Sequence, residues 1–175
     1  MVSSYSTSIM ALVHARQLSS YKSRQSPTSE ALLVSVHTMP SRAGLAPGKL
    51  LFAEDEMQIL NSILSSSIST RKMSQPHKSD VLKHIESCIA FHLAGHGISD
   101  PIHPSKSCLL PEDCVGNPLR VVDLTSLKLF KKAPWLPFLS ACSTGESQSN
   151  ALQDECIHLA SACRLAGFPH VVGSL

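Results

Sequence analysis

Ser87-Cys-Ile-Ala-Phe-His-Leu-Ala94 is a short apolar run, and Gly95-His-Gly97 follows it directly. A run of this length that ends at glycines is typical of a buried strand in the middle of a sheet. The pattern places His96 between two glycines, just after the predicted strand. Ligand sites of α/β proteins lie beyond the carboxyl ends of the strands, so His96 is a candidate functional residue.

A second apolar run, Trp135-Leu-Pro-Phe-Leu-Ser-Ala-Cys142, is broken in the same way at Ser143-Thr-Gly145. A cysteine nucleophile needs a base within hydrogen-bond distance to form a thiolate at neutral pH. Parallel strands end at one edge of a sheet, so we expect Cys142 and His96 to form a catalytic dyad. The backbone N–H groups of Gly97 and Cys142 are the oxyanion-hole candidates, because glycine lets the backbone approach a substrate closely.

Predicted helices and strands alternate along the rest of the chain. Apolar residues recur at three- and four-residue intervals between Glu54 and Leu64, which predicts a helix with one buried face. That face would contain Met57, Leu60, Ile63 and Leu64. Ser79 is expected to cap a short helix that buries Val81, Leu82 and Ile85. Further helices are predicted over 8–18, 121–129 and 150–166, and further strands over 31–36, over 108–110 and from 171 onward.

This alternation predicts an α/β fold with a mostly parallel central sheet. The length of 175 residues favours a single domain over 1–175, with residues 19–30 as a loop or linker. Hydrophobic residues make up 43% and charged residues 16%, which argues against intrinsic disorder. The net charge of +2 is too small to indicate nucleic-acid binding. The sequence has no phosphate-binding loop, dinucleotide fingerprint or G-x-S-x-G motif, and we expect no cofactor.

The six cysteines include no C-x-x-C pair, which favours reduced thiols over a disulfide scaffold or a zinc ribbon. No apolar run is long enough to span a membrane, and the N-terminus lacks the apolar core of a signal peptide. We therefore expect a cytoplasmic protein without membrane contact. A mitochondrial transit peptide is the alternative, because Arg16, Lys22 and Arg24 lie among serines with no acidic residue before Glu30.

Four motifs together resemble the CHAT domain in the form common in filamentous fungi. They are Phe91-His-Leu-Ala-Gly-His-Gly97, Leu139-Ser-Ala-Cys-Ser-Thr-Gly145, Asp154-Glu155 and His158-Leu-Ala-Ser-Ala-Cys-Arg-Leu-Ala-Gly-Phe168. The resemblance covers most of the chain. It implies a caspase-like three-layer sandwich and a cysteine endopeptidase, in which a His-Gly motif and an Ala-Cys motif supply the dyad.

The resemblance assigns the dyad to His96 and Cys142, with a protein or peptide as the substrate. Gly95, Ala141, Ser143 and Gly145 would support the site. Family members often sit beside repeat or signalling domains, which makes such proteins further candidate partners. The family pattern usually continues beyond both ends of this sequence, so we expect an incomplete domain. The alternative function is an inactive CHAT-type interaction module in a signalling assembly.

Other residues have simpler interpretations. His92 is expected to be a core histidine. Cys88, His92 and His96 recur every four residues, but a strand would spread them too far apart for one metal ion. Asp154 and Glu155 are expected in the first turn of a helix, where acidic side chains interact favourably with the helix dipole. A role for the pair in bracing the active-site loop is the alternative. Cys108 and Cys114 are expected to be structural.

Overall fold

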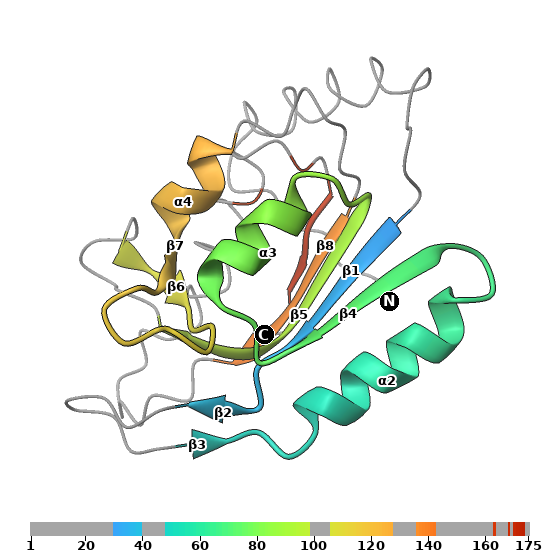
Figure 1. Ribbon diagram of the computed structural model, residues 1–175, viewed down its shortest axis with the longest axis horizontal. Helices are drawn as coiled ribbons and strands as arrows, with labels where there is room; N and C mark the ends of the chain where they lie inside the picture. The colour runs from blue at the N-terminus through green and yellow to red at the C-terminus, as the bar shows by residue number, and fades with distance from the viewer. Residues whose placement is uncertain are drawn as a thin grey trace, which may run out of the picture.

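The computed structural model describes residues 30–39, 48–98, 106–127 and 136–142, together with Cys163, Phe168 and residues 170–173. Within these residues, the central feature is a sheet of seven strands (Figure 1). The strands are β1 (Glu30–Ser35), β4 (Ser69–Ser74), β5 (Ala90–Ile98), β6 (Cys108–Leu109), β7 (Leu119–Arg120), β8 (Leu136–Cys142) and β9 (Val172–Gly173). The helices bounded within the described residues are α2 (Ala53–Leu64), α3 (Lys78–Ile85) and α4 (Val121–Ser126). A separate hairpin pairs β2 (Thr38–Met39) with β3 (Gly48–Lys49).

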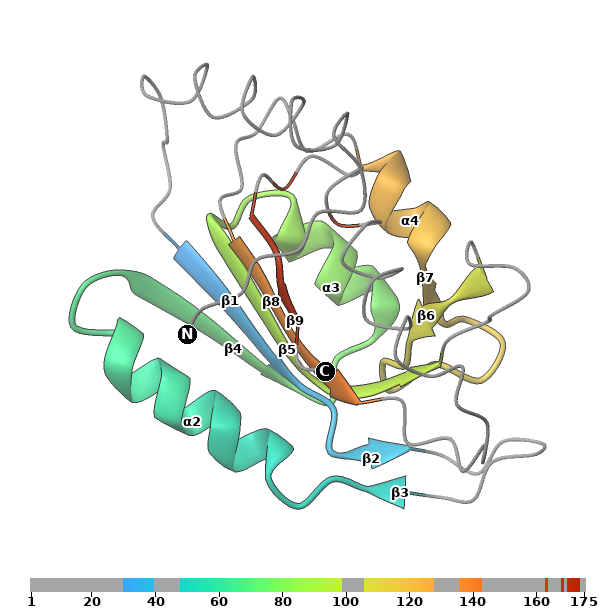
Figure 2. The ribbon, with the colours of Figure 1, turned by 180° about the vertical axis from the view of Figure 1, so that it is seen from behind.

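The sheet is mixed, which corrects the predicted mostly parallel arrangement. Parallel pairing joins β4 to β1, β1 to β5, β5 to β8, and β8 to β9. Figure 2 shows these strands side by side. Antiparallel pairing joins β5 to β6 and β6 to β7. The short strands arise because β5 runs on through its glycines, and Gly97 and Ile98 pair with the returning chain at Leu109 and Cys108.

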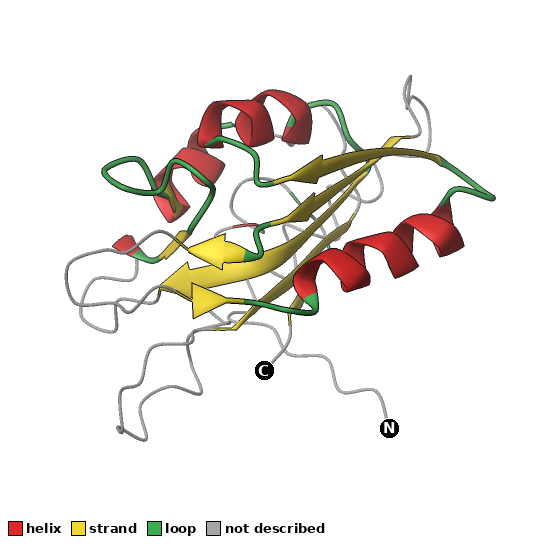
Figure 3. Ribbon diagram, turned by 60° about the horizontal axis from the view of Figure 1, so that its bottom comes forward, coloured by secondary structure: helices red, strands yellow, loops and turns green. Residues whose placement is uncertain are grey.

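The two faces of the sheet carry different helices. Figure 3 shows α2 on one side of the strands and α3 and α4 on the other. Every residue of β1 after Glu30 is buried, as expected for a parallel strand covered on both faces. Leu32 and Val34 pack into the larger core with α3. Ala31 and Leu33 pack with Met57 of α2. The alternation along β1 therefore separates two apolar layers.

The helices predicted around 54–64 and 79–85 form as α2 and α3, with local corrections, and α4 confirms the helix predicted over 121–129, which ends earlier than expected. Met57, Leu60 and Leu64 face the sheet, but Ile63 is 61% exposed, because it lies on the solvent side of α2. Helix α3 begins at Lys78, with His77 as its N-cap, so Ser79 lies inside the helix and does not cap it. The first N–H of α3 is satisfied from outside the helix, since Lys78 N donates to Asp113 Oδ1 at 2.7 Å.

The predicted strands over 31–36, 108–110 and 135–142 are confirmed as β1, β6 and β8, and β9 confirms the strand after 171. Strand β4 was not predicted, because it is an edge strand whose sequence, Ser-Thr-Arg-Lys-Met-Ser, is mostly polar. The predicted helix over 8–18, the linker and most of the helix over 150–166 lie outside the described residues. None of the helices described here is long and apolar enough to cross a membrane.

Candidate active site

His96 lies within β5, which corrects the prediction that it follows the strand. The strand continues to Ile98 because β6 supplies an antiparallel partner beyond the last parallel pair. The side chain of His96 is 3% exposed, and this burial lowers its pKa. His96 is therefore held in the neutral form, which is the form that accepts a proton.

Cys142 is the last residue of β8, and its Cα is the register partner of the Cα of His96. Ala141 is likewise paired with Gly95. The sheet thus brings the two sequence motifs together, as expected for neighbouring parallel strands. Ser143 and Gly145, which follow β8, lie outside the described residues, and so do Asp154 and Glu155.

The backbone of Gly97 faces the β8 side of β5. Val36 N donates to Ala94 O at 2.8 Å, and Leu110 N donates to His96 O at 3.0 Å. Carbonyls of alternate strand residues point to the same edge, so β1 and β6 occupy one edge of β5. The backbone groups of the neighbouring odd-numbered residues Gly95 and Gly97, including the Gly97 N–H, therefore point to the opposite edge of β5, where β8 pairs.

Gly95 allows β5 to pack closely against the end of β1. A Cβ at this position would lie 3.2 Å from Val36 Cβ and 3.3 Å from Leu93 Cδ2. Val36 and Leu93 belong to the larger core on the α3 side. Gly95, one residue before His96 on β5, is therefore needed for the close packing of this strand against Val36 in the larger core.

The buried thiols of the core differ chemically from a nucleophile. Burial raises the pKa of Cys88 and that of Cys163 to about 12. Cys108 and Cys114 are also buried, and both pack with Leu110 in a small cluster, in line with a structural role. Thiolate is the reactive form of cysteine, so the core positions of Cys88 and Cys163 are inert at neutral pH.

A polar cluster that the sequence analysis missed lies between α2, β5 and β8. Glu56 of α2 accepts a hydrogen bond from Ser140 Oγ at 2.9 Å, and its Oε1 lies 3.6 Å from His92 Nε2. The His92 ring packs against Phe138, with the ring centroids 5.1 Å apart. Burial lowers the pKa of His92 to about 4, so its contact with Glu56 at neutral pH is not an ion pair.

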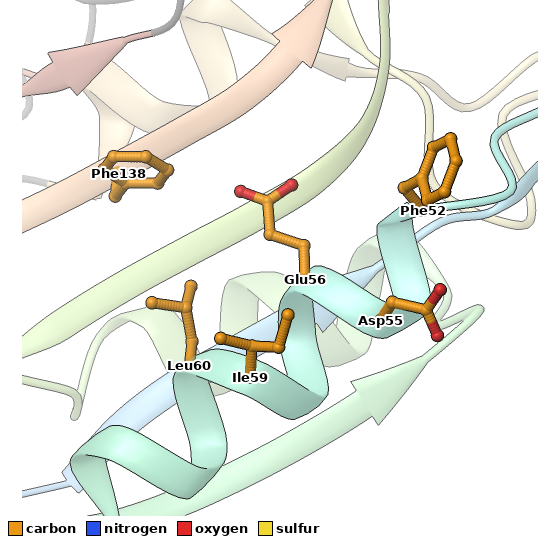
Figure 4. Close-up of a pocket in the computed structure, with 6 residues that line it drawn as sticks. All are labelled: Phe52, Asp55, Glu56, Ile59, Leu60 and Phe138. Carbon is orange, nitrogen blue, oxygen red and sulfur yellow. The ribbon is translucent and has the colours of Figure 1, made fainter.

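The same region contains an open hollow of about 280 Å³. Figure 4 shows the Glu56 carboxylate pointing from α2 towards the strands, with Phe138 across from Leu60. The lining residues are Phe52, Asp55, Glu56, Ile59, Leu60 and Phe138. The signal that could have found Glu56 is its place one turn before Leu60, at the border of the buried face of the predicted helix.

The structure places Cys88 and His92, two of the three residues that recur every four positions before Gly97, on opposite faces of the sheet. Cys88 packs with Val81 and Ile85 in the core on the α3 side, whereas His92 approaches Glu56 on the α2 side. Within the described ranges, no group of three His, Cys, Asp or Glu side chains is placed to hold a metal ion.

A sequence model of the CHAT domain matches residues 2–175. No curated protein matches the chain.

Proposed function

Because the chain belongs to the CHAT domain family, which is related to the caspase-like proteases, we propose that it is a cysteine endopeptidase with a Cys142–His96 dyad. One observation carries the proposal. The Cα atoms of His96 and Cys142 are register partners on neighbouring parallel strands. Residues paired in this way lie on the same face of a pleated sheet, which is the placement that a nucleophile and its base require.

The proposed reaction is hydrolysis of a peptide bond in a protein or peptide substrate. His96 takes the proton of the Cys142 thiol, and the sulfur attacks the scissile carbonyl carbon. The backbone N–H groups of Gly97 and Cys142 donate to the oxyanion of the tetrahedral intermediate. The C–N bond breaks as His96 gives its proton to the leaving amine. A water molecule, deprotonated by His96, then cleaves the thioester and restores the free thiol.

Three features of the structure support these roles. Burial keeps His96 neutral and able to accept a proton. The Gly97 N–H points to the edge of β5 on which β8 and Cys142 lie. Helices on both faces of the sheet support the caspase-like three-layer sandwich that we infer for the complete domain (Figure 3).

The experiment is intact-mass analysis of the protein after reaction with a peptide acyloxymethyl ketone, which alkylates activated thiols. We expect fast addition of one inhibitor molecule to Cys142. Cys142→Ala should abolish this addition, and His96→Ala should slow it strongly. Cys88→Ala is the matched control, because that thiol is buried in the core, and it should leave the labelling rate unchanged.

Slow labelling that is spread over several cysteines and indifferent to His96 would contradict the peptidase proposal. It would favour the second candidate, an inactive interaction module that keeps the fold. The two candidates also differ in a functional assay, since Cys142→Ala removes the activity of an enzyme but leaves a binding surface intact.

A further inference from the structure

The first turn of α2 is held to the sheet by two carboxylates. Glu54 accepts hydrogen bonds from Ser35 Oγ at 2.5 Å and from Ser74 Oγ at 3.0 Å, which joins the helix to β1 and β4. Glu56 accepts from Ser140 Oγ at 2.9 Å, which joins the same turn to β8. The helix therefore contacts strands on both sides of β5 through polar side chains, of which only Ser74 is exposed.

Glu56 touches both strands that carry the proposed dyad. Ser140 lies two residues before Cys142 on β8, and its register partner is Ala94, two residues before His96 on β5. The second oxygen of Glu56 lies 3.6 Å from His92 Nε2, also on β5. One carboxylate thus approaches β5 and β8 within two to four residues of His96 and Cys142.

We propose that Glu56 is a positioning residue for the dyad, an inference that rests on the proposed peptidase function. Its hydrogen bond from Ser140 fixes the end of β8 to α2, and its carboxylate packs 3.6 Å from His92 Nε2 of β5 without a hydrogen bond, so the ends of both strands rest against one side chain. The cluster is not a second nucleophilic centre, because the carboxylate stands between the hydroxyl and the imidazole. A serine nucleophile requires the imidazole next to its hydroxyl.

The chemistry of the dyad makes it sensitive to this separation. Proton transfer from the thiol requires the base within hydrogen-bond distance, and a misplacement of about 1 Å can lower a rate by about 100-fold. Ser140 is separated from Cys142 by a single residue of a regular strand, so a displacement at Ser140 is transmitted directly to the end of β8.

The test compares the rate of Cys142 alkylation by the acyloxymethyl ketone in Glu56→Ala, Glu56→Gln, Ser140→Ala and the double variant Glu56→Ala/Ser140→Ala. We expect each alanine variant to slow labelling by about tenfold or more. The double variant should be no slower than the slower single variant, because both remove one interaction. Glu56→Gln keeps an oxygen that accepts from Ser140 and should retain most of the rate.

Asp55→Ala is the matched control. Asp55 is exposed on the same turn, and within the described ranges no hydrogen bond joins it to the sheet. The rate of Cys142 alkylation in Asp55→Ala should therefore equal that of the wild type. Rates are taken well below the unfolding temperature of each variant, which is measured in parallel. The pH profile of labelling provides a second readout, since a displaced His96 raises the pH at which the Cys142 thiolate forms.

Labelling of Glu56→Ala and Ser140→Ala at the wild-type rate and with the wild-type pH profile would overturn the inference, even if the unfolding temperature falls. Ser140→Ala removes only one hydroxyl, so it decides the question if Glu56→Ala does not fold. Failure of the peptidase proposal gives a different result, namely wild-type protein whose Cys142 labelling does not depend on His96. That result would overturn both proposals.

Discussion

His96 and Cys142 form the last Cα pair between β5 and β8. The chain between them leaves β5 through the antiparallel strands β6 and β7, passes through α4 and returns to pair in parallel beside β5. Two motifs that are distant in sequence therefore meet at one edge of the sheet, through backbone pairing alone.

Cys88 and Cys163 should resist alkylation in the folded protein. A pKa of about 12 leaves roughly one thiol in 10⁴ or fewer as thiolate near neutral pH, and the burial of both residues blocks access. Peptide mapping after brief treatment with iodoacetamide should find both residues unmodified, and mapping in denaturant should find both modified. Modification of Cys88 at equal rates in the two conditions would show that the core around α3 opens readily.

The stability of the fold should fall as the pH drops from about 6.5 to about 4. The pKa of His92 is near 6.5 in the unfolded chain and about 4 in the folded one, so the unfolded state binds more protons in this range. The contribution of His92 to the free energy of unfolding is fully present above its pKa in the unfolded chain. It is lost, by about 3 kcal/mol, as the pH falls to its pKa in the folded protein. Urea unfolding across the pH range measures the effect.

A His92→Phe variant should lose that part of the pH dependence, because it removes the titrating group and keeps a ring against Phe138. His170→Asn, at an exposed position, should retain it. An unchanged slope in His92→Phe would assign the acid sensitivity to other groups.

Gly95→Ala should destabilise the protein by about 1–3 kcal/mol, as expected for overpacking in a core. The added Cβ would lie 3.2 Å from Val36 Cβ, an atom fixed directly to the backbone of a buried segment, and 3.3 Å from Leu93 Cδ2. Relief would require β1 and β5 to separate. Thermal unfolding should show a lower midpoint, and an unchanged midpoint would indicate that the two strands adjust without cost.

Asp123 should stabilise the region around α4 by about 1–2 kcal/mol, through a helix cap and a half-buried ion pair. Its Oδ2 accepts from Arg120 N at 2.7 Å and lies 2.8 Å from Lys78 Nζ. Asp123→Ala removes both interactions, whereas Lys78→Met removes only the ion pair and should cost less. Equal losses in the two variants would show that the cap contributes nothing measurable to the unfolding free energy.

Several parts of the fold could be predicted from local patterns. Apolar runs bounded by glycine or serine marked β1, β5 and β8, because a strand buried on both faces must be apolar throughout. Helical spacing marked α2, since one face must meet the sheet. The motifs around His96 and Cys142 could be recognised for the same reason: each stands at the end of a run whose burial is dictated by its own composition.

What remained depended on neighbours that are distant in sequence. Strand β4 is polar and forms because β1 offers it an unpaired edge, and β5 continues past its glycines because β6 returns to pair with it. The contact of Glu56 with Ser140 joins residues 84 positions apart. The sequence by itself determined which segments are buried and which residues can do chemistry. The tertiary structure decided which of them meet, because strand register and helix placement minimise the free energy of the whole core and no local pattern encodes them.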